Sequence, residues 1–428
     1  MTLYILLFAI ILAALVGTPL FAVILAVAMI GFYHSGVDLS VITIEIYRIA
    51  DTPLLMALPL FTLAGYIMGE SKTSERLVRL TRVFFGWMPG GLAIVSLATC
   101  ALFTAFTGAS GVTIVALGAL LYPALKQGKY TEKFSLGLVT TSGSLGLLFP
   151  PSLPLILYGI IAQQMNIGQD VTISNLFKAG LLPGILMVVL LSCWSLWTSR
   201  NNPKSKVPFS GKEALLALRE AVWEIPLPFF ILVGVYGGFL TISEVAAVTA
   251  IYIIVVEVFI YREIKLSRLP GVMRESMVVC GGILLIIGVS LAFTNYLIDA
   301  EVPMRLFKLI QKLVTGPVAF LILLNIFLLL LGAILDIFSA LIIMVPLILP
   351  VAVSYGIDPV HLGIIFLANM QIGYFTPPVG MNLFIASYRF NKPITELYLA
   401  TIPFMLVLLA AVLLITYWPS LSLVFLAR

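Results

Sequence analysis

Long apolar runs separated by short polar segments cover almost the whole chain. Residues 3–33 form the first run, and as a single helix it would measure about 46 Å, against roughly 30 Å for the hydrocarbon core of a bilayer. Gly17-Thr18-Pro19 therefore predicts a division into two spans. Further spans are predicted at 53–69, about 175–198, 224–240, 244–261, 276–297 and about 395–425. The pattern predicts an all-α polytopic membrane protein.

Two segments carry charge between apolar positions. Ser74 to Trp87 reads SERLVRLTRVFFGW, with Arg76, Arg79 and Arg82 three residues apart. This spacing predicts a basic amphipathic helix lying along a membrane surface, with a simple polar loop as the alternative. The mixed-charge segment 299–315 is its counterpart later in the chain, a second surface helix.

Two apolar runs, about 90–125 and 316–355, have a polar or glycine-containing centre. The first is centred on FTAFTGASG and the second on LGAILDIFSA. Each arm of the first run is about 15 residues, or about 23 Å as a helix, too short to cross a bilayer comfortably. Both runs therefore predict re-entrant helical hairpins whose tips stay at mid-membrane. A pair of full spans is the alternative.

Two further runs are interrupted near their middles. The run at about 131–163 contains TTSGSLGLLFPPS, and the run at about 359–388 contains IGYFTPPVGMN. Glycine and proline break a helix there, and the freed backbone groups must be buried in protein or line a wet cavity. Such carbonyls, together with the hydroxyls, suit a small cation. A plain kink without a ligand is the alternative.

The chain repeats itself at a spacing of 227 residues. This shift places Pro150-Pro151 on Pro377-Pro378 and Gly146 on Gly373, and aligns the hydropathy blocks. Each half would contain three spans, a surface helix, a hairpin, a broken helix and a last span. The predicted division is a first repeat at 1–198, a cytoplasmic linker at 199–222 and a second repeat at 223–428. An odd number of crossings in the first half inverts the second half in the membrane.

Composition and charge support this interpretation. Hydrophobic residues make up 61% of the chain and charged residues 10%, whereas soluble domains carry about 25% charged residues. With residue 1 outside, 18 of the 24 Lys and Arg fall in predicted inner segments. This bias follows the positive-inside rule, so the net charge of +5 is a topology signal and not a sign of nucleic-acid binding.

Candidate catalytic residues are few. The two histidines, His34 and His361, are predicted in outer loops, and Ser110 has no GxSxG context. We therefore predict that the chain is not an enzyme and carries no cofactor. Asp336 is the acidic residue of the second hairpin tip, and an intramembrane carboxylate is by default functional. A hydrogen-bonded residue that only shapes the turn is the alternative.

Several motifs in order resemble one transporter family. LPLFTLAG (58–65), FTAFTGASG (103–111), LLFPPSLPLILYG (147–159), GAILDIFSALIIMVPLILP (332–350), GIDPVHLGII (356–365) and NMQIGYFTPPVGMNLF (369–384) are similar to the large membrane subunit of tripartite ATP-independent periplasmic (TRAP) transporters, in the ion-transporter superfamily. The segment 241–244 departs from the family pattern, which more often has proline after the threonine.

The resemblance implies sodium-coupled import of an organic acid, such as a sialic acid or a C4-dicarboxylate, across the bacterial inner membrane. It also implies a periplasmic substrate-binding protein, a small membrane subunit and an elevator mechanism, in which both hairpins and both broken helices move against a scaffold. The alternatives are a stand-alone sodium/dicarboxylate symporter of the same superfamily, or a non-transporting scaffold or channel.

The resemblance also places three sites, with Na⁺ as the coupling ion. The first sodium site would use Thr107, Gly108, Ser110, Thr141, Ser142 and Gly143, and the second would use Gly332, Asp336, Gly373 and Thr376. Substrate would lie between the hairpin tips, near Ser152, Pro378 and Asn382, with helix N-termini facing its carboxylate.

Overall fold

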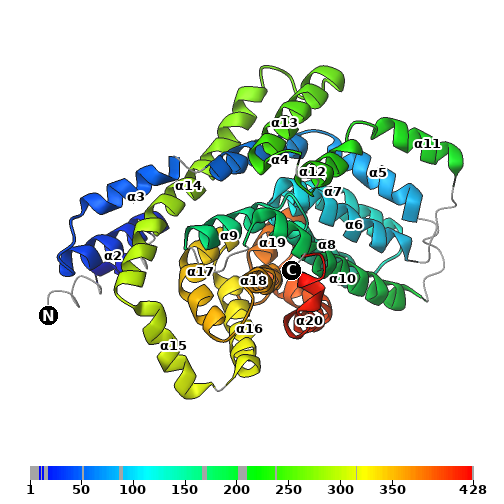
Figure 1. The fold of residues 1–428 in the computed structure, drawn as a ribbon. Helices are drawn as coiled ribbons and strands as arrows, with labels where there is room; N and C mark the ends of the chain where they lie inside the picture. The colour runs from blue at the N-terminus through cyan, green and yellow to red at the C-terminus, as the bar shows by residue number, and fades with distance from the viewer. Residues whose placement is uncertain are drawn as a thin grey trace.

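The structure is a computed structural model that describes residues 9, 10, 12, 13, 18–50, 53–85, 90–165, 171–200, 210–236, 239–314 and 316–426. Over these residues the regular structure is entirely helical (Figure 1). The first half contains α2 (Leu20–His34), α3 (Ser40–Ala50), η1 (Pro53–Met56), α4 (Ala57–Glu70), α5 (Thr73–Phe85), α6 (Gly91–Thr107), α7 (Ser110–Gln127), α8 (Glu132–Ser142), η2 (Leu145–Leu148), α9 (Leu153–Gln164) and α10 (Ile173–Ser199).

The remaining elements are α11 (Gly211–Glu220), α12 (Pro226–Tyr236), α13 (Ile242–Ile254), η4 (Val255–Ile260), α14 (Leu269–Asp299), α15 (Val302–Leu313), α16 (Pro317–Ile334), α17 (Ile337–Ser354), α18 (Pro359–Gly373), α19 (Met381–Phe390), α20 (Ile394–Tyr417) and α21 (Ser420–Leu423). Within the described ranges, six helices are long and apolar enough to cross a membrane. The pair formed by α8–η2 and α9, bent by 41°, would make a seventh span. The all-α membrane fold is confirmed, while most of the predicted span before residue 18 lies outside the described residues.

The hairpins and interrupted helices occur where the sequence predicts them. The helices α6 and α7 join through two residues at the first tip, and α16 and α17 do so at the second. A non-helical segment separates α18 from α19, as the η2 region separates α8 from α9. Both Pro-Pro bonds in these breaks are cis. The depth of each tip in a membrane remains a prediction.

Helix ends repeat with the sequence shift of 227 residues. Helix α7 spans Ser110–Gln127 and α17 spans Ile337–Ser354, so both ends are displaced by that number. The starts of α8 and α18, at Glu132 and Pro359, are displaced by the same number. These matching bounds support two equivalent halves, and their inverted arrangement remains a prediction.

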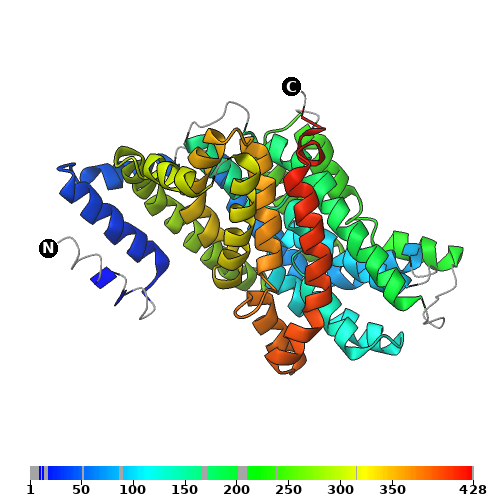
Figure 2. The same cartoon turned by 90° about the horizontal axis from the view of Figure 1, so that it is seen from below.

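The helices pack as two groups. In one group α4 contacts α13 and α14, and α14 also contacts α2 and α3, so the long α14 links α4 to the end of the molecule formed by α2 and α3 (Figure 1). In the other group the hairpins pack on the broken helices, including contacts between halves: α17 with α9 and α7 with α19. Figure 2 shows the molecule from below the view of Figure 1, with α17, α18 and α20 running side by side through the centre.

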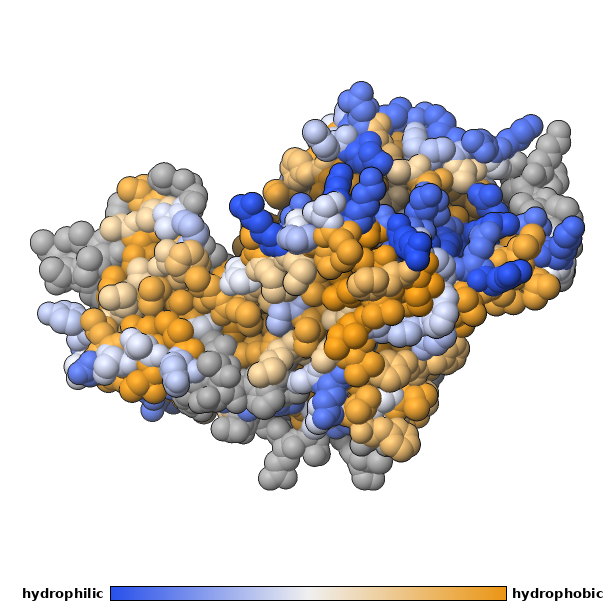
Figure 3. All heavy atoms as spheres, turned by 90° about the horizontal axis from the view of Figure 1, so that it is seen from above, coloured by the Kyte–Doolittle hydropathy of each residue, from blue (hydrophilic) through white to orange (hydrophobic). Residues whose placement is uncertain are grey.

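The surface is largely apolar. Figure 3 shows hydrophilic residues gathered along one part of the visible face and hydrophobic residues over most of the rest. Large apolar side chains such as Val233, Ile251, Leu330 and Leu406 are more than half exposed. Apolar exposure on this scale fits a surface that faces lipid.

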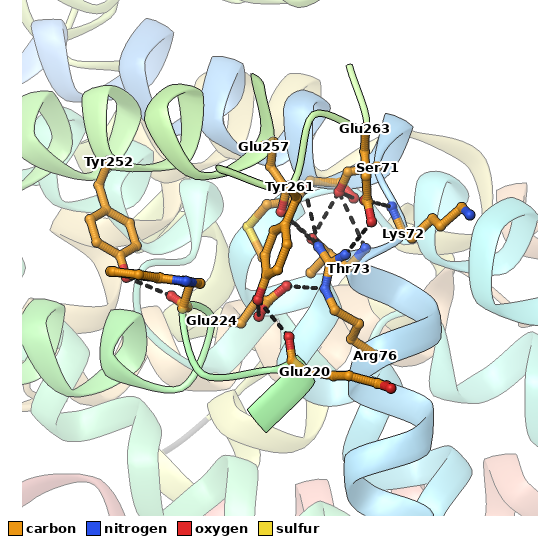
Figure 4. Close-up of polar contacts among 12 residues, drawn as sticks. Ser71, Lys72, Thr73, Arg76, Glu220, Glu224, Tyr252, Glu257, Tyr261 and Glu263 are labelled. Atoms are coloured by element: carbon orange, nitrogen blue, oxygen red, sulfur yellow. Dashed lines mark hydrogen bonds and ion pairs between the residues drawn. The ribbon is translucent and has the colours of Figure 1, made fainter. Parts of the chain in front are cut away.

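Two arginines of α5, Arg76 and Arg79, pair with carboxylates of the protein, while Arg82 is exposed. The position of this helix along a membrane surface stays a prediction. Arg76 is buried and forms ion pairs with Glu224, Glu257 and Glu263 (Figure 4). The Glu257 carboxylate also accepts a hydrogen bond of 2.8 Å from the Thr73 hydroxyl. Three carboxylates from segments far along the chain therefore neutralise the buried Arg76 guanidinium and accept its hydrogen bonds.

Arg76 and its three glutamates form a buried joint between α5 and the second half, and neighbouring contacts extend it. The Arg76 guanidinium lies 4.0 Å from the centre of the Tyr261 ring, and the Tyr261 hydroxyl donates to the Glu224 carboxylate over 3.1 Å. Arg79, which is more exposed, pairs with Glu213 and Glu220. The helix α11 of the predicted linker is thereby fixed against α5.

His361 also corrects a prediction. It was expected in an outer loop, but it lies in the first turn of α18 and is 3% exposed. Its ring nitrogens lie 3.2 Å from the Ser422 hydroxyl and 3.2 Å from the Thr416 carbonyl oxygen. The loop ends earlier because Asp358 caps the helix by accepting hydrogen bonds from two backbone N–H groups.

Candidate ion and substrate site

The first hairpin tip is shaped by Gly108. Helix α6 ends at Thr107, Gly108 adopts φ +65°, and α7 begins at Ser110. A Cβ atom at Gly108 would lie 2.7 Å from the Leu153 side chain at the start of α9. Glycine is therefore needed here both for the left-handed backbone and for the close approach of the tip to the broken helix.

The first tip and the first helix break are in direct contact. The Thr104 hydroxyl donates to the Gly143 carbonyl over 2.9 Å, and a Cβ at Gly143 would lie 3.2 Å from the Ser110 carbonyl oxygen. The structure therefore brings together the tip and break residues predicted for the first sodium site. Thr104, which joins the two, was not predicted. Its place one turn before the tip was the sequence signal that could have identified it.

The hydroxyls of this site are not equivalent. Thr141 donates to the Gly137 carbonyl over 2.8 Å, and Ser142 lies 3.4 Å from the Val139 carbonyl, so both bond within α8. In contrast, the Thr107 hydroxyl is buried and has no hydrogen-bond partner among the described residues. A buried polar group without a partner is costly, so Thr107 is the hydroxyl best suited to receive a ligand.

Helix α4 covers this tip. A Cβ at Gly65 would lie 2.7 Å from the Thr107 Cα atom and 2.9 Å from the Phe106 carbonyl oxygen. Only glycine lets the two backbones approach this closely. Gly65 lies in the LPLFTLAG motif, yet periodicity gave no indication that it faces the hairpin tip.

The second tip and break meet through two backbones. A Cβ at Gly373 would lie 2.5 Å from the Gly332 Cα atom, so these two glycines are in van der Waals contact. Close by, the Ile337 N–H donates to the Tyr374 hydroxyl over 3.0 Å. Three of the four residues predicted for the second sodium site, Gly332, Asp336 and Gly373, therefore lie around one junction.

Asp336 serves as the N-cap of α17. Its carboxylate accepts hydrogen bonds of 3.0 Å from both the Phe338 and Ser339 N–H groups, and another from the Ser339 hydroxyl. This is the turn-shaping role left open by the sequence. Thr376, the fourth predicted residue, donates to the Ile372 carbonyl over 2.9 Å and lies 3.7 Å from the Met405 sulfur on α20. Its hydroxyl is thus directed toward α20.

The predicted substrate residues occupy different environments. Ser152 is fully buried and donates to the Leu147 carbonyl. Pro378 is exposed, and its carbonyl accepts a hydrogen bond from the Tyr398 hydroxyl. Asn382 is fully buried, and its amide nitrogen lies 3.4 Å from the Thr140 carbonyl oxygen of the other half. Of these three, Asn382 connects the two breaks.

Two buried side-chain amides have atoms without a hydrogen-bond partner among the described residues. The Asn382 Oδ1 atom has no hydrogen-bond partner in the described part of the chain, and neither does the side-chain amide of Gln371. Gln371 was not predicted, although it lies in the NMQIGYFTPPVG motif. Together with Thr107, these groups offer two acceptors, one donor and a hydroxyl to an incoming ion or solute.

Comparison with known proteins identifies the family. A family model described as tripartite ATP-independent periplasmic transporter, DctM component, matches residues 3–421. The C4-dicarboxylate TRAP transporter large permease protein DctM of Pseudomonas aeruginosa is 33% identical over 383 residues, which is 89% of this chain and 88% of that protein. The chain belongs to the DctM family of TRAP transporters. It is therefore a multi-pass permease of the inner membrane and not an enzyme.

Two other similarities extend this result. The isethionate TRAP transporter permease protein DctMQ of Oleidesulfovibrio alaskensis is 33% identical over 88% of this DctM-family chain, which spans 58% of that longer protein. The crystal structure of the YdaH transporter of Alcanivorax borkumensis matches with a TM-score of 0.64 at 14% identity, over 89% of this chain and 87% of that one. The second similarity shows a shared fold.

Proposed function

We propose that this DctM-family chain is the membrane permease of a sodium-coupled uptake system for a small organic acid. Its partners would be a small membrane subunit and a periplasmic substrate-binding protein. The observation that carries the proposal is the direct contact of each hairpin tip with a helix break, at Gly143 and Ser110 in one half and at Gly332 and Gly373 in the other. Such junctions concentrate oxygen atoms inside the protein without clustering buried charges.

Sodium fits this chemistry. It is a hard cation that favours oxygen ligands, and the Thr107 hydroxyl is a buried oxygen without a partner. We assign Thr107, Gly108, Ser110, Thr141, Ser142 and Gly143 to the first sodium site. The Asp336 carboxylate would supply negative charge to the second, with Gly332, Gly373 and Thr376. Ion binding would then relieve the unfavourable burial of Thr107.

We place the organic acid between the two junctions. Buried amides of Gln371 and Asn382 have atoms without partners in the described structure, and Ser152 and Pro378 flank the breaks. Helices α7, α9, α17 and α19 each begin at a tip or break, and helix N-termini attract carboxylates. Two relatives are named as permeases for small organic anions, C4-dicarboxylate and isethionate.

The two packed groups support an elevator mechanism. The group built on α4, α13 and α14 would remain fixed as the scaffold, and the hairpins with the broken helices would slide as one unit. Contacts of α17 with α9 and of α7 with α19 join the two halves within the sliding unit. Such contacts let both tips carry ions and substrate across together.

Uptake into proteoliposomes tests the function. The chain, its small subunit and its binding protein should accumulate a radiolabelled acid, chosen by a screen of the binding protein, only when sodium is supplied outside. Thr107→Ala should raise the sodium concentration for half-maximal uptake several-fold. The control Thr140→Ala should leave it unchanged, because Thr140 donates within α8 to the Leu136 carbonyl. Uptake driven by protons alone would reject sodium coupling, and strong uptake by the isolated chain would favour a stand-alone symporter.

A further inference from the structure

The cations of the second surface helix, α15, have no ion-pair partner in the described part of the chain. Arg305, Lys308 and Lys312 are exposed on one face of this helix, and within the described residues none of them forms an ion pair. On the first surface helix, by contrast, Arg76 and Arg79 are neutralised by carboxylates. Half of the six Lys and Arg outside the predicted inner segments are therefore concentrated on α15 without internal compensation.

An apolar groove runs beside the same helix. It has a volume of about 400 Å³ and lies between α15 and the second hairpin. Its lining includes Leu306, Ile310, Phe320, Phe327, Met344 and Ile348. Figure 1 shows α15 extending along this hairpin, with which it is in contact through α17. Helix α15 thus presents cations on one face and lines an apolar groove with the other.

We infer that α15 and the second hairpin form a binding site for one anionic phospholipid. An acyl chain would occupy the groove, and Arg305, Lys308 and Lys312 would bind the phosphate. Long Lys and Arg side chains reach around a helix to the phosphate level while their stems cover apolar surface. The three cations favour a negatively charged phosphate by charge complementarity. The groove favours an acyl chain over a peptide, because its side chains are apolar and offer no hydrogen bonds.

The expected affinity follows from the three charges. Each Lys or Arg near an anionic lipid surface contributes about fivefold to binding, equivalent to about 1 kcal/mol. Three cations would favour phosphatidylglycerol over the zwitterionic phosphatidylethanolamine by on the order of a hundredfold. Because the groove borders the hairpin that would slide, the bound lipid would also alter the rate of uptake, a consequence that rests on the proposed function.

Lipid binding to the purified full chain tests the inference directly. Native mass spectrometry would compare dioleoyl-phosphatidylglycerol with dioleoyl-phosphatidylethanolamine at equal concentration. The triple variant Arg305→Gln, Lys308→Gln, Lys312→Gln should lose the preference for the anionic lipid. A control triple variant at exposed inner lysines, Lys133→Gln, Lys212→Gln, Lys265→Gln, removes the same charge and should keep it.

Two more measurements keep the test decisive. Leu323 lines the groove and is 43% exposed, so Leu323→Trp should fill the groove and lower retention of both lipids without disturbing the core. The single variant Lys308→Gln should lose about fivefold in affinity for phosphatidylglycerol. Unchanged phosphatidylglycerol binding in the α15 triple variant, or equal loss in the control, would overturn the inference. Lipid binding is read without transport, so failure of the proposed function would leave this result intact.

Discussion

The Ser144 hydroxyl donates a hydrogen bond of 3.0 Å to the backbone carbonyl of Gln371, a residue 227 positions later. That separation equals the spacing of the internal repeat, so Ser144 bonds to its own counterpart. In a pair of halves related by two-fold symmetry, only residues beside the axis can contact their counterparts. The bond therefore places the two helix breaks next to the axis of the proposed inverted repeat.

Replacing Gln371 tests whether its buried amide serves a ligand. Both amide atoms lack a hydrogen-bond partner within the described residues, which costs about 1–3 kcal/mol. Gln371→Met removes these atoms at similar volume, so the free energy of unfolding should stay unchanged or rise while uptake falls at least tenfold. Thermal unfolding in detergent and uptake in proteoliposomes measure the two effects.

Ser144→Ala is the matched control for this position. It removes one hydrogen bond and should lower stability by about 0.5–1.5 kcal/mol with little loss of uptake. A Gln371→Met protein that is less stable yet transports normally would show that the amide has a structural role only.

The sequence predicted much of this fold because hydropathy and helix breakers act locally. Gly108, Gly373 and the two Pro-Pro pairs indicated where helices had to stop, and the helix ends occur there. The partners of Arg76 could not be predicted in this way, because its carboxylates lie 148 to 187 residues away. Glu257 was a usable signal, since a carboxylate next to an apolar run needs a nearby cation.

At the candidate site, the sequence predicted which residues lie at the tips and breaks, but not which hydrogen bonds their side chains form. The tip and break of the first half meet, but the Thr141 hydroxyl bonds within its own helix. The Thr376 hydroxyl, in the second break, bonds back to the Ile372 carbonyl of α18 and lies against Met405. Side-chain direction depends on tertiary packing, which a single sequence pattern does not contain.

Gly373→Ala should separate the second hairpin from its broken helix. The added Cβ would lie 2.5 Å from the Gly332 Cα atom, so one backbone must shift. Overpacking of this kind costs about 1–3 kcal/mol. Gly281→Ala in α14 is the control, because nothing lies within 4 Å of its new Cβ. Thermal unfolding should show a lower midpoint for Gly373→Ala alone, and equal midpoints would contradict the contact.

Cysteine labelling tests the inverted topology. In a background with the exposed Cys193 replaced by serine, a cysteine at Lys265 should react with a membrane-impermeant maleimide only from the cytoplasmic side. A cysteine at Thr172, at the start of α10, should react only from outside. Both positions are exposed, so access is not limited by burial. Labelling of both from one side would exclude the proposed inversion.

Arg76→Gln tests the buried joint between α5 and the second half. It would leave Glu224, Glu257 and Glu263 without their shared cation, and breaking a buried ion pair costs about 3–5 kcal/mol. Arg79→Gln is the control, because Arg79 is 40% exposed and its pairs with Glu213 and Glu220 are solvated. That change should lower the midpoint of thermal unfolding far less than Arg76→Gln, because solvated ion pairs contribute little to stability.

The loss in Arg76→Gln should depend on pH. Burial raises the pKa of Glu224 even with Arg76 beside it, and removing the guanidinium would raise it further. A carboxyl whose pKa is raised on folding destabilises the protein as pH rises through the folded pKa, and has no such effect below its unfolded value of 4.5. The stability difference from wild type should therefore be largest at alkaline pH and shrink as the carboxyls protonate. A difference that is constant from acidic to alkaline pH would show that lost packing of the arginine, and not unpaired charge, accounts for the effect.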